Sequence, residues 1–211
     1  MKLNFYQLPT SVGGVSLRVA KGHFATRNSH TNYFFDVTAQ RCSLKGANAV
    51  AQQLAGKFRL STIDTILCMD GTVAIGTCLA QQLARDGYRS MNAGGDIYIL
   101  RENKQANGML IFRENVHYAL KDKNVLILTA AITTGGAAQQ GMRCVRYYGG
   151  TVAWIASIYS YLNELDGIPV ESLFNAGNIT DYISHSPETC PLCAQGVELD
   201  AVVDKYGYSS L

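Results

Sequence analysis

The stretch that decides the fold runs from Asn124 to Gly150 and reads NVLILTAAITTGGAAQQGMRCVRYYGG. It begins with four consecutive apolar residues, Val125 to Leu128, the pattern of a parallel strand that is buried on both faces. A helix follows, ends at the tyrosines and glycines of positions 147 to 150, and leads to a second apolar run that begins at Thr151. The stretch therefore predicts a βαβ unit.

Small residues connect the first strand of this unit to its helix. They supply two hydroxyls and a flexible backbone where the helix begins: Thr133, Thr134, Gly135, Gly136 and Ala137. Several amide N–H groups can converge on an anion at a helix N-terminus. These residues therefore predict a phosphate-binding loop, and the competing interpretation is an ordinary glycine-rich turn.

Strands and helices alternate over residues 43 to 160. Helical spacing covers 43–58 and 74–83, and strands are expected at 64–68, 96–100 and 151–159. The alternation is typical of an α/β fold with a mainly parallel sheet covered by helices on both faces. Ligands of such sheets bind beyond the carboxyl ends of the strands, so the loops after residues 68, 100 and 128 should converge on one site.

The two ends of the chain are less regular. Residues 1–40 contain short candidate strands at 15–19 and 33–37, and residues 162–211 predict an irregular segment with a short helix around 168–173. A chain of 211 residues, 47% hydrophobic and 16% charged, is expected to form a single domain, 1–211.

Charge and hydropathy exclude two classes of partner. The net charge is +2 and no Lys/Arg run builds a basic face, which argues against nucleic acid. No window approaches the roughly 20 apolar residues of a membrane-spanning helix, and MKLNFYQLPT lacks the pattern of a signal peptide. We expect a soluble cytoplasmic protein with no nucleic-acid or membrane partner.

The strand and loop of the opening stretch resemble the phosphoribosyl pyrophosphate (PRPP) motif of type I phosphoribosyltransferases. That motif has four apolar residues, two acids, two mostly apolar residues and a Thr-Thr-Gly-type loop. In the family the loop holds the 5′-phosphate, and the acids hydrogen-bond the ribose hydroxyls and help to place Mg²⁺. This chain keeps the strand and the loop but has Thr129 and Ala130 at the acidic, ribose-binding positions.

The resemblance implies the type I phosphoribosyltransferase fold, a mainly parallel twisted sheet flanked by helices. It assigns residues 1–40 to a small N-terminal hood, 43–160 to the core and 162–211 to a C-terminal segment. It also implies Mg²⁺ as the cofactor of an active enzyme, a small-molecule ligand that carries a ribose 5′-phosphate, and a homodimer.

One loop is similar to that of a particular subfamily, the orotate phosphoribosyltransferases. Residues 99–108, ILRENKQANG, resemble the mobile Arg-Lys-Glu-x-Lys-x-His-Gly loop that closes over PRPP. Arg101 and Gly108 match that pattern, whereas Gln105 and Asn107 replace a lysine and a histidine. Lys104 is the candidate substitute for the lysine, so Arg101 and Lys104 are the catalytic candidates.

A second segment, residues 30–36 with the sequence HTNYFFD, resembles the His-Ser-x-Tyr-Tyr-x-Asp hood of the same enzymes. The resemblance makes His30, Thr31 and Tyr33 candidate hood residues over the base.

The loop after the strand at 64–68 corresponds to the family's pyrophosphate loop. Its candidates are Asp70, Gly71 and Thr72, with Thr72 where orotate phosphoribosyltransferases often carry a lysine. Asp70 adds negative charge near a polyanion site, and its competing interpretation is a turn residue or helix N-cap.

Cys190 and Cys193 are separated by two residues, a spacing that lets two thiolates chelate one tetrahedral metal ion. A structural zinc site needs four ligands, and neither His185 nor the distant Cys42 completes an evident set. A buried turn is the preferred interpretation, with a redox pair as the third, and no metal site is predicted.

His23 is expected to be a packing or surface residue. Three other cysteines are expected in the core: Cys68, Cys78 and Cys144.

These observations support two functional hypotheses. One is an orotate phosphoribosyltransferase-like enzyme, which would convert orotate and PRPP to orotidine 5′-monophosphate and pyrophosphate with weakened or lost activity. The other is a non-catalytic sensor or regulator that binds a nucleoside monophosphate on the same fold. An unrelated Rossmann-like module is disfavoured because no G-x-G-x-x-G follows an early strand.

Overall fold

The computed structural model describes residues 3–9, 14–85 and 90–211. The chain forms two compact units. The larger unit is Gln40–Asn175, and the smaller unit combines Met1–Ala39 with Ala176–Leu211. Whether the chain acts as a single domain stays a prediction.

The larger unit is built on a sheet in the order β5-β4-β6-β7-β9-β8. Every neighbouring pair is parallel except β8 and β9. The strands are β4 (Thr65–Cys68), β5 (Tyr98–Arg101), β6 (Asn124–Ile132), β7 (Thr151–Ser160), β8 (Glu164–Leu165) and β9 (Ile168–Asn175). The mainly parallel α/β fold expected from the sequence is confirmed.

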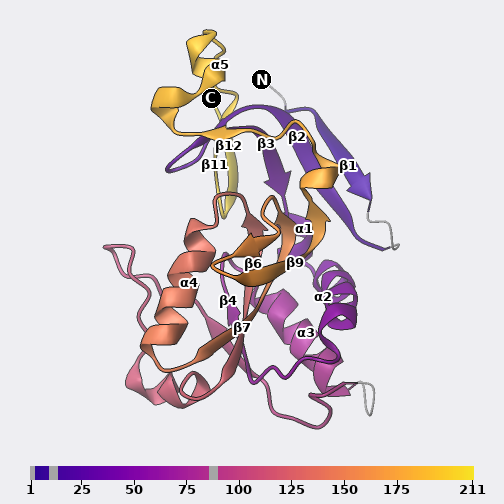
Figure 1. Cartoon of the computed structure of the whole chain (residues 1–211). Helices are drawn as coiled ribbons and strands as arrows, with labels where there is room; N and C mark the ends of the chain where they lie inside the picture. The colour runs from indigo at the N-terminus through magenta and orange to yellow at the C-terminus, as the bar shows by residue number, and fades with distance from the viewer. Residues whose placement is uncertain (1–2, 10–13, 86–89) are drawn as a thin grey trace. The chain divides into compact units, whose positions relative to one another are not determined.

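Helices cover both faces of this sheet. Figure 1 shows α4 on one side of the strands and α2 and α3 on the other. The bounds are α1 (Thr38–Cys42), α2 (Leu44–Phe58), α3 (Val73–Arg85), η2 (Glu114–Ala119) and α4 (Gly136–Tyr147). Helix α2 begins at an N-cap serine, since Ser43 Oγ accepts a 2.9 Å hydrogen bond from Gly46 N.

The core of the larger unit explains why the opening stretch folds as predicted. Residues Val125 to Leu128 of β6 are fully buried. Val125 and Ile127 pack with apolar residues of β4, β7 and α4, including Leu67, Ile155 and Met142. Cys68, Cys78 and Cys144 are buried, as expected.

Residues 168–173 were expected to form a short helix, and this prediction was wrong. They lie in β9, which pairs in parallel with β7 so that Val170 is opposite Ile155. Asp166 and Gly167 connect β8 to β9 with φ of 50° and 80°. An Asp-Gly pair with positive φ is typical of a tight β-hairpin turn, so pairing with β7 and turn chemistry override the helical spacing.

The smaller unit is a second sheet, in the order β10-β3-β2-β11-β12 with β1 also paired to β2. Its strands come from both ends of the chain: β1 (Phe5–Pro9), β2 (Ser16–Ala25), β3 (His30–Asp36), β10 (Ser184–His185), β11 (Ala201–Asp204) and β12 (Gly207–Ser210). Three short helical segments connect the later strands: η3 (Ala176–Asn178), η4 (Pro187–Thr189) and α5 (Pro191–Ala194). The C-terminal segment is therefore more regular than expected.

A small apolar core holds this second sheet together. One cluster of this core contains five buried side chains: Ala20, Phe24, Phe34, Ala201 and Val203. Within residues 3–9, 14–85 and 90–211, none of the helices has both the length and the apolar character needed to cross a bilayer.

Candidate functional site

The carboxyl ends of three neighbouring strands lie side by side in the larger unit. β4 pairs in parallel with both β5 and β6, so that Cys68 is opposite Arg101 on one side and Leu128 on the other. The loops that leave these strands therefore start at the same edge of the sheet, where ligands of open parallel sheets bind.

Asp70, in the loop after β4, is the centre of a polar network at this edge. Asp70 and Gly71 both have positive φ, 51° and 78°. Asp70 N donates to Glu102 Oε1 at 3.0 Å, and Asp70 O accepts from Arg41 Nη1 at 2.7 Å. Its carboxylate Oδ2 accepts a 2.5 Å hydrogen bond from Thr129 Oγ1. The loop is thus fixed by contacts to β6, β5 and α1.

The three predicted pyrophosphate-loop residues have different environments. Asp70 is half-buried, Gly71 is exposed and Thr72 is fully buried. Thr72 Oγ1 is the donor to two carbonyl oxygens, Met69 O at 2.8 Å and Leu128 O at 3.0 Å. Thr72 therefore anchors the loop to the strand ends, and it offers no cation in place of the family's lysine.

The predicted phosphate loop lies between β6 and α4. Thr134 and Gly136 are exposed, whereas Thr133 and Ala137 are half-buried. Gly135 is buried with φ of 81°, and a Cβ there would lie 2.7 Å from Leu165 Cδ1. Glycine is thus required for both conformation and space.

The first turn of α4 presents amides that have no carbonyl partner within the helix. The intrahelical bonds begin with Gln139 N, which donates to Gly135 O at 2.9 Å. With the exposed hydroxyl of Thr134, the first-turn amides and the helix dipole can hold an anion.

The ribose-binding candidates Thr129 and Ala130 are both buried in β6, with 1% and 6% of their surface exposed. Ala130 has no polar side-chain atom. Thr129 directs its hydroxyl to Asp70, so a carboxylate lies beside one of the two positions where the family has an acid.

The catalytic candidates Arg101 and Lys104 lie at the start of the loop after β5. Arg101 is exposed at the end of the strand. Lys104 Nζ is 3.2 Å from Glu102 Oε2, so its charge is partly offset by this ion pair. Glu102 is not among the residues predicted from the sequence, although a carboxylate directly after a parallel strand is itself a signal of a site.

The loop after β5 folds back as a hairpin, with its turn at Asn107 and Gly108. Lys104 pairs with Leu110, and Gly108 has φ of 83°. Two residues of α4 hold the hairpin: Gln140 Nε2 donates to Gly108 O, and Cys144 Sγ donates to Leu110 O at 3.5 Å.

The hood candidates lie on β3 of the smaller unit. Thr31 Oγ1 donates to Tyr33 O at 2.9 Å, and Tyr33 Oη donates to Asp181 Oδ1 at 2.7 Å. Burial and the hydrogen bond to Asp181 raise the pKa of the Tyr33 phenol. His30 has other neighbours, and its Nδ1 is 3.2 Å from Cys193 Sγ. A role of these residues over a base stays a prediction.

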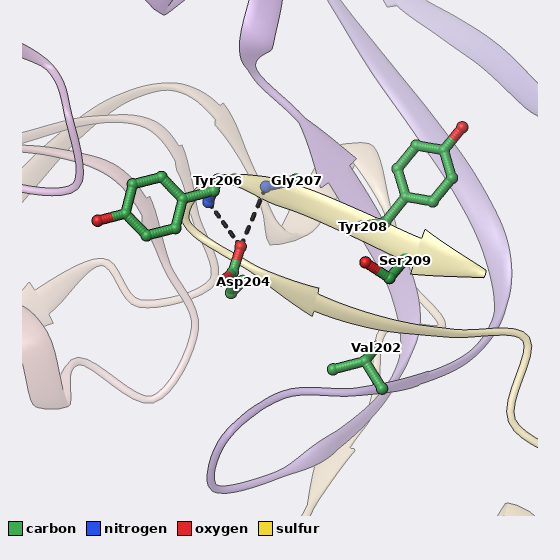
Figure 2. A pocket seen from close by; sticks show the side chains of 6 residues that line it. All are labelled: Val202, Asp204, Tyr206, Gly207, Tyr208 and Ser209. Carbon is green, nitrogen blue, oxygen red and sulfur yellow. Dashed lines mark hydrogen bonds between the residues drawn. The ribbon is translucent and has the colours of Figure 1, made fainter. Parts of the chain in front are cut away.

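A pocket on the smaller unit contains none of the predicted site residues. It is lined by Val202, Asp204, Tyr206, Gly207, Tyr208 and Ser209 of the β11–β12 hairpin (Figure 2). Asp204 Oδ1 accepts hydrogen bonds from Tyr206 N at 2.7 Å and from Gly207 N at 3.1 Å. The carboxylate thus stabilises the hairpin turn, and the pocket offers no cationic side chain to an anion.

No protein-family model matches the chain. A curated orotate phosphoribosyltransferase from Chlorobaculum parvum is 29% identical over 182 residues, which cover 85% of this chain and 86% of that protein. Among solved structures, adenine phosphoribosyltransferase from Thermoanaerobacter pseudethanolicus matches with a TM-score of 0.51 at 20% identity, covering 81% of this chain and 95% of the other. Orotate phosphoribosyltransferase from Mycobacterium tuberculosis in complex with PRPP matches with a TM-score of 0.50 at 14% identity, covering 69% and 82%.

The chain has the type I phosphoribosyltransferase fold, and its sequence is similar to that of curated orotate phosphoribosyltransferases. It is orotate phosphoribosyltransferase-like in this sense, since the similarity extends over most of its length.

Proposed function

We propose that the larger unit binds a ligand that carries a ribose 5′-phosphate and transfers the phosphoribosyl group only weakly. The loop Thr133–Ala137 carries this proposal, since it combines an exposed hydroxyl with the N-terminus of a twelve-residue helix. The reaction of the relatives' family joins orotate to PRPP with release of pyrophosphate. Such a reaction needs a grip on the 5′-phosphate, an orientation for the ribose hydroxyls and neutralisation of the leaving pyrophosphate.

Asp70 partly meets the second requirement, the orientation of the ribose hydroxyls. The replacement of two acids by Thr129 and Ala130 removes two acceptors from β6. The Asp70 carboxylate, held at 2.5 Å by Thr129, returns one acceptor to the same strand end from a neighbouring loop. We infer that Asp70 accepts a hydrogen bond from a ribose hydroxyl in place of the missing acids.

The residues also fit a single carboxylate contact to Mg²⁺, the family's cofactor. Mg²⁺ keeps several waters and is held by one or two carboxylates together with substrate phosphates. Asp70 is half-buried and fixed by its backbone contacts, so it is the residue that would hold the ion. When bound, the ion would neutralise charge on the leaving pyrophosphate.

Neutralisation of the leaving pyrophosphate is the requirement that this chain meets least well. Thr72 is buried and neutral, Gln105 and Asn107 are amides, and Lys104 is paired with Glu102. Each lost charged contact costs on the order of 1.5–3 kcal/mol, and two such losses lower the rate of transfer by about 100-fold or more. Weak transfer is therefore expected.

A non-catalytic sensor of a nucleoside monophosphate is the second candidate. The loss of cationic side chains around the pyrophosphate position favours it, because a monophosphate ligand needs the loop of α4 but no pyrophosphate contacts.

A cytoplasmic location and a homodimer belong to both proposals and rest on the resemblance to orotate phosphoribosyltransferases.

Calorimetry with and without Mg²⁺ tests the proposal, with PRPP, orotidine 5′-monophosphate, UMP and uridine as ligands. We expect PRPP and the monophosphates to bind and uridine, which has no phosphate, to bind at least tenfold more weakly. An assay of orotate consumption then separates the candidates. Slow PRPP-dependent turnover supports the transferase, and monophosphate binding without turnover supports the sensor. Equal affinity for UMP and uridine overturns both.

A further inference from the structure

Four side chains from the two ends of the chain meet in the smaller unit. They are His23 of β2, His30 of β3, and the Cys190–Cys193 pair at α5. Their ligand atoms all lie within 4.8 Å of one another. His23 and Cys190 are 167 residues apart in sequence, and both are buried.

The distances between these atoms match a tetrahedral metal site. His23 Nε2 is 3.2 Å from His30 Nδ1, and 3.5 Å and 3.7 Å from the sulfurs of Cys190 and Cys193. His30 Nδ1 is 3.2 Å from Cys193 Sγ. A tetrahedral ion with Zn–N of about 2.0 Å and Zn–S of about 2.3 Å separates its ligand atoms by about 3.3–3.8 Å. The four measured separations are close to those that one ion imposes.

A bulge directs His23, and regular pairing places His30 beside it. The β2–β3 register shifts between Lys21 and Phe24, so His23 lies in a bulge, and bulges re-aim side chains. The bulge is held by Asp200, whose Oδ2 accepts from His23 N at 2.7 Å and whose N donates to His23 O at 2.8 Å. His30 begins β3 directly opposite Ala25.

A tight turn brings the two cysteines together. Cys190 is the N-cap of α5 and Cys193 lies within it. Ala194 N donates to Cys190 O at 3.1 Å, and Gly196 N donates to Cys193 O at 2.9 Å. The same turn leads to Val197, whose carbonyl contacts His23.

That contact selects the tautomer of the neutral His23 ring. His23 Nδ1 is 2.9 Å from Val197 O, a carbonyl that can only accept, so Nδ1 carries the proton. In the neutral ring Nε2 then presents a lone pair toward His30 and the two sulfurs. A second hydrogen bond of this kind fixes the orientation of most histidine ligands in metal sites.

We propose that His23 Nε2, His30 Nδ1, Cys190 Sγ and Cys193 Sγ bind one structural Zn²⁺. Two imidazoles and two thiolates at tetrahedral spacing select zinc among the divalent ions, and two thiolates balance its charge. The protein fills all four positions, so the site is closed and structural. It is independent of the phosphate loop in the larger unit.

The smaller unit gains stability from such an ion. Its sheet is assembled from segments at opposite ends of the chain. Compact units of this size commonly need a metal or a disulfide in addition to their core. The ion joins the β2–β3 hairpin to the turn that precedes β11, and so connects the two segments.

Metal analysis of the purified full-length chain, expressed with zinc and kept reduced, is the first test. We expect about one zinc per chain. Exchange with Co²⁺ should give the intense visible absorption of a tetrahedral ion together with a thiolate-to-metal charge-transfer band. A strong chelator should lower Tm by about 5 °C or more, and added zinc should restore it. A chain without bound metal and without a Co²⁺ spectrum overturns the proposal.

Variants assign the ligands. Cys193→Ser and His30→Ala should each lower zinc affinity at least tenfold, whereas Cys42→Ser, which changes an exposed cysteine outside the cluster, should keep full zinc content. Cys193→His replaces the sulfur ligand with a nitrogen ligand. This variant should retain Co²⁺ with a weaker charge-transfer band than the parent chain, because one thiolate is lost. Since Cys193 is exposed, its variants should fold. Full zinc occupancy in Cys193→Ser and His30→Ala would overturn the assignment.

Discussion

Thr129 Oγ1 donates a 2.5 Å hydrogen bond to Asp70 Oδ2, which joins the end of β6 to the loop after β4. Thr129 occupies a position where phosphoribosyltransferases of this type carry an acid, and its only polar side-chain atom faces a carboxylate from elsewhere in the chain. The carboxylate beside this position therefore comes from the loop after β4. Binding of the ribose and of Mg²⁺ should depend on Asp70.

Thr129→Val removes this hydroxyl while keeping the shape of the side chain. We expect the free energy of unfolding to fall by about 1.5 kcal/mol, because a hydrogen bond to a charged acceptor is lost inside a buried strand end. Urea denaturation measures the change. Thr77→Val is the matched control, since Thr77 is exposed on α3 and its hydroxyl bonds only Val73 O. Equal effects of the two substitutions would show that the Asp70 contact contributes nothing.

Thr134→Asp tests the phosphate loop. Thr134 is exposed just before α4, so a carboxylate there repels a bound phosphate. Two unit charges about 4 Å apart at an effective dielectric of about 20 repel by about 4 kcal/mol, which weakens binding more than 100-fold. Calorimetry with UMP measures the loss. Thr77→Asp adds the same charge on α3 and should leave the affinity within twofold, and unchanged affinity in Thr134→Asp would refute the loop assignment.

Gly135→Ala separates steric clash from backbone strain in the same loop. Its φ is 81° and its new Cβ would lie 2.7 Å and 3.2 Å from the methyl carbons of Leu165 and Leu162. Gly108→Ala has a nearly equal φ of 83° with nothing within 4 Å. Strain alone costs about 1–2 kcal/mol, and the clash adds about 1–3 kcal/mol, so Gly135→Ala should be clearly the less stable variant. Equal thermal stability of the two would mean that Leu162 and Leu165 move aside freely.

Local sequence patterns anticipated the regular elements, because their causes are local. The apolar run at Val125–Leu128 and the glycines after Thr134 are sufficient to predict β6 and α4. The Asp70–Thr129 contact joins residues 59 positions apart and was not predictable from spacing. The histidine partners of Cys190 were missed for the same reason, since a bulge in β2 and a turn after residue 190 must both form before the four ligands meet.

Cys144 should make stability depend on alkaline pH. Burial raises the pKa of its thiol from 9.0 to about 11. The folded chain therefore holds the proton after the unfolded chain has released it, so the contribution to stability is complete below pH 9 and is lost as the pH rises toward 11. Over that window the free energy of unfolding should fall by about 2 kcal/mol more than in Cys144→Ala.

Urea denaturation at intervals from pH 8 to pH 11 measures the difference between the two chains. Cys42→Ala, at an exposed position, should follow the parent chain over the same range. Parallel pH profiles for the parent and Cys144→Ala would contradict the prediction.

Gln140→Ala should release the hairpin after β5 from α4. Gln140 Nε2 donates to Gly108 O at the tip of the hairpin, whereas its neighbour Gln139 contacts Asp166. Loss of one hydrogen bond of about 1 kcal/mol raises the population of molecules in which this hairpin is open about fivefold. Hydrogen exchange of the amides of Gln105 and Gly108, which are bonded within the hairpin, should accelerate by that factor. Gln139→Ala should leave these rates unchanged, because its partner lies in the β8–β9 turn. If both variants accelerate exchange equally, helix fraying explains the effect, and the hairpin does not depend on the Gln140 contact.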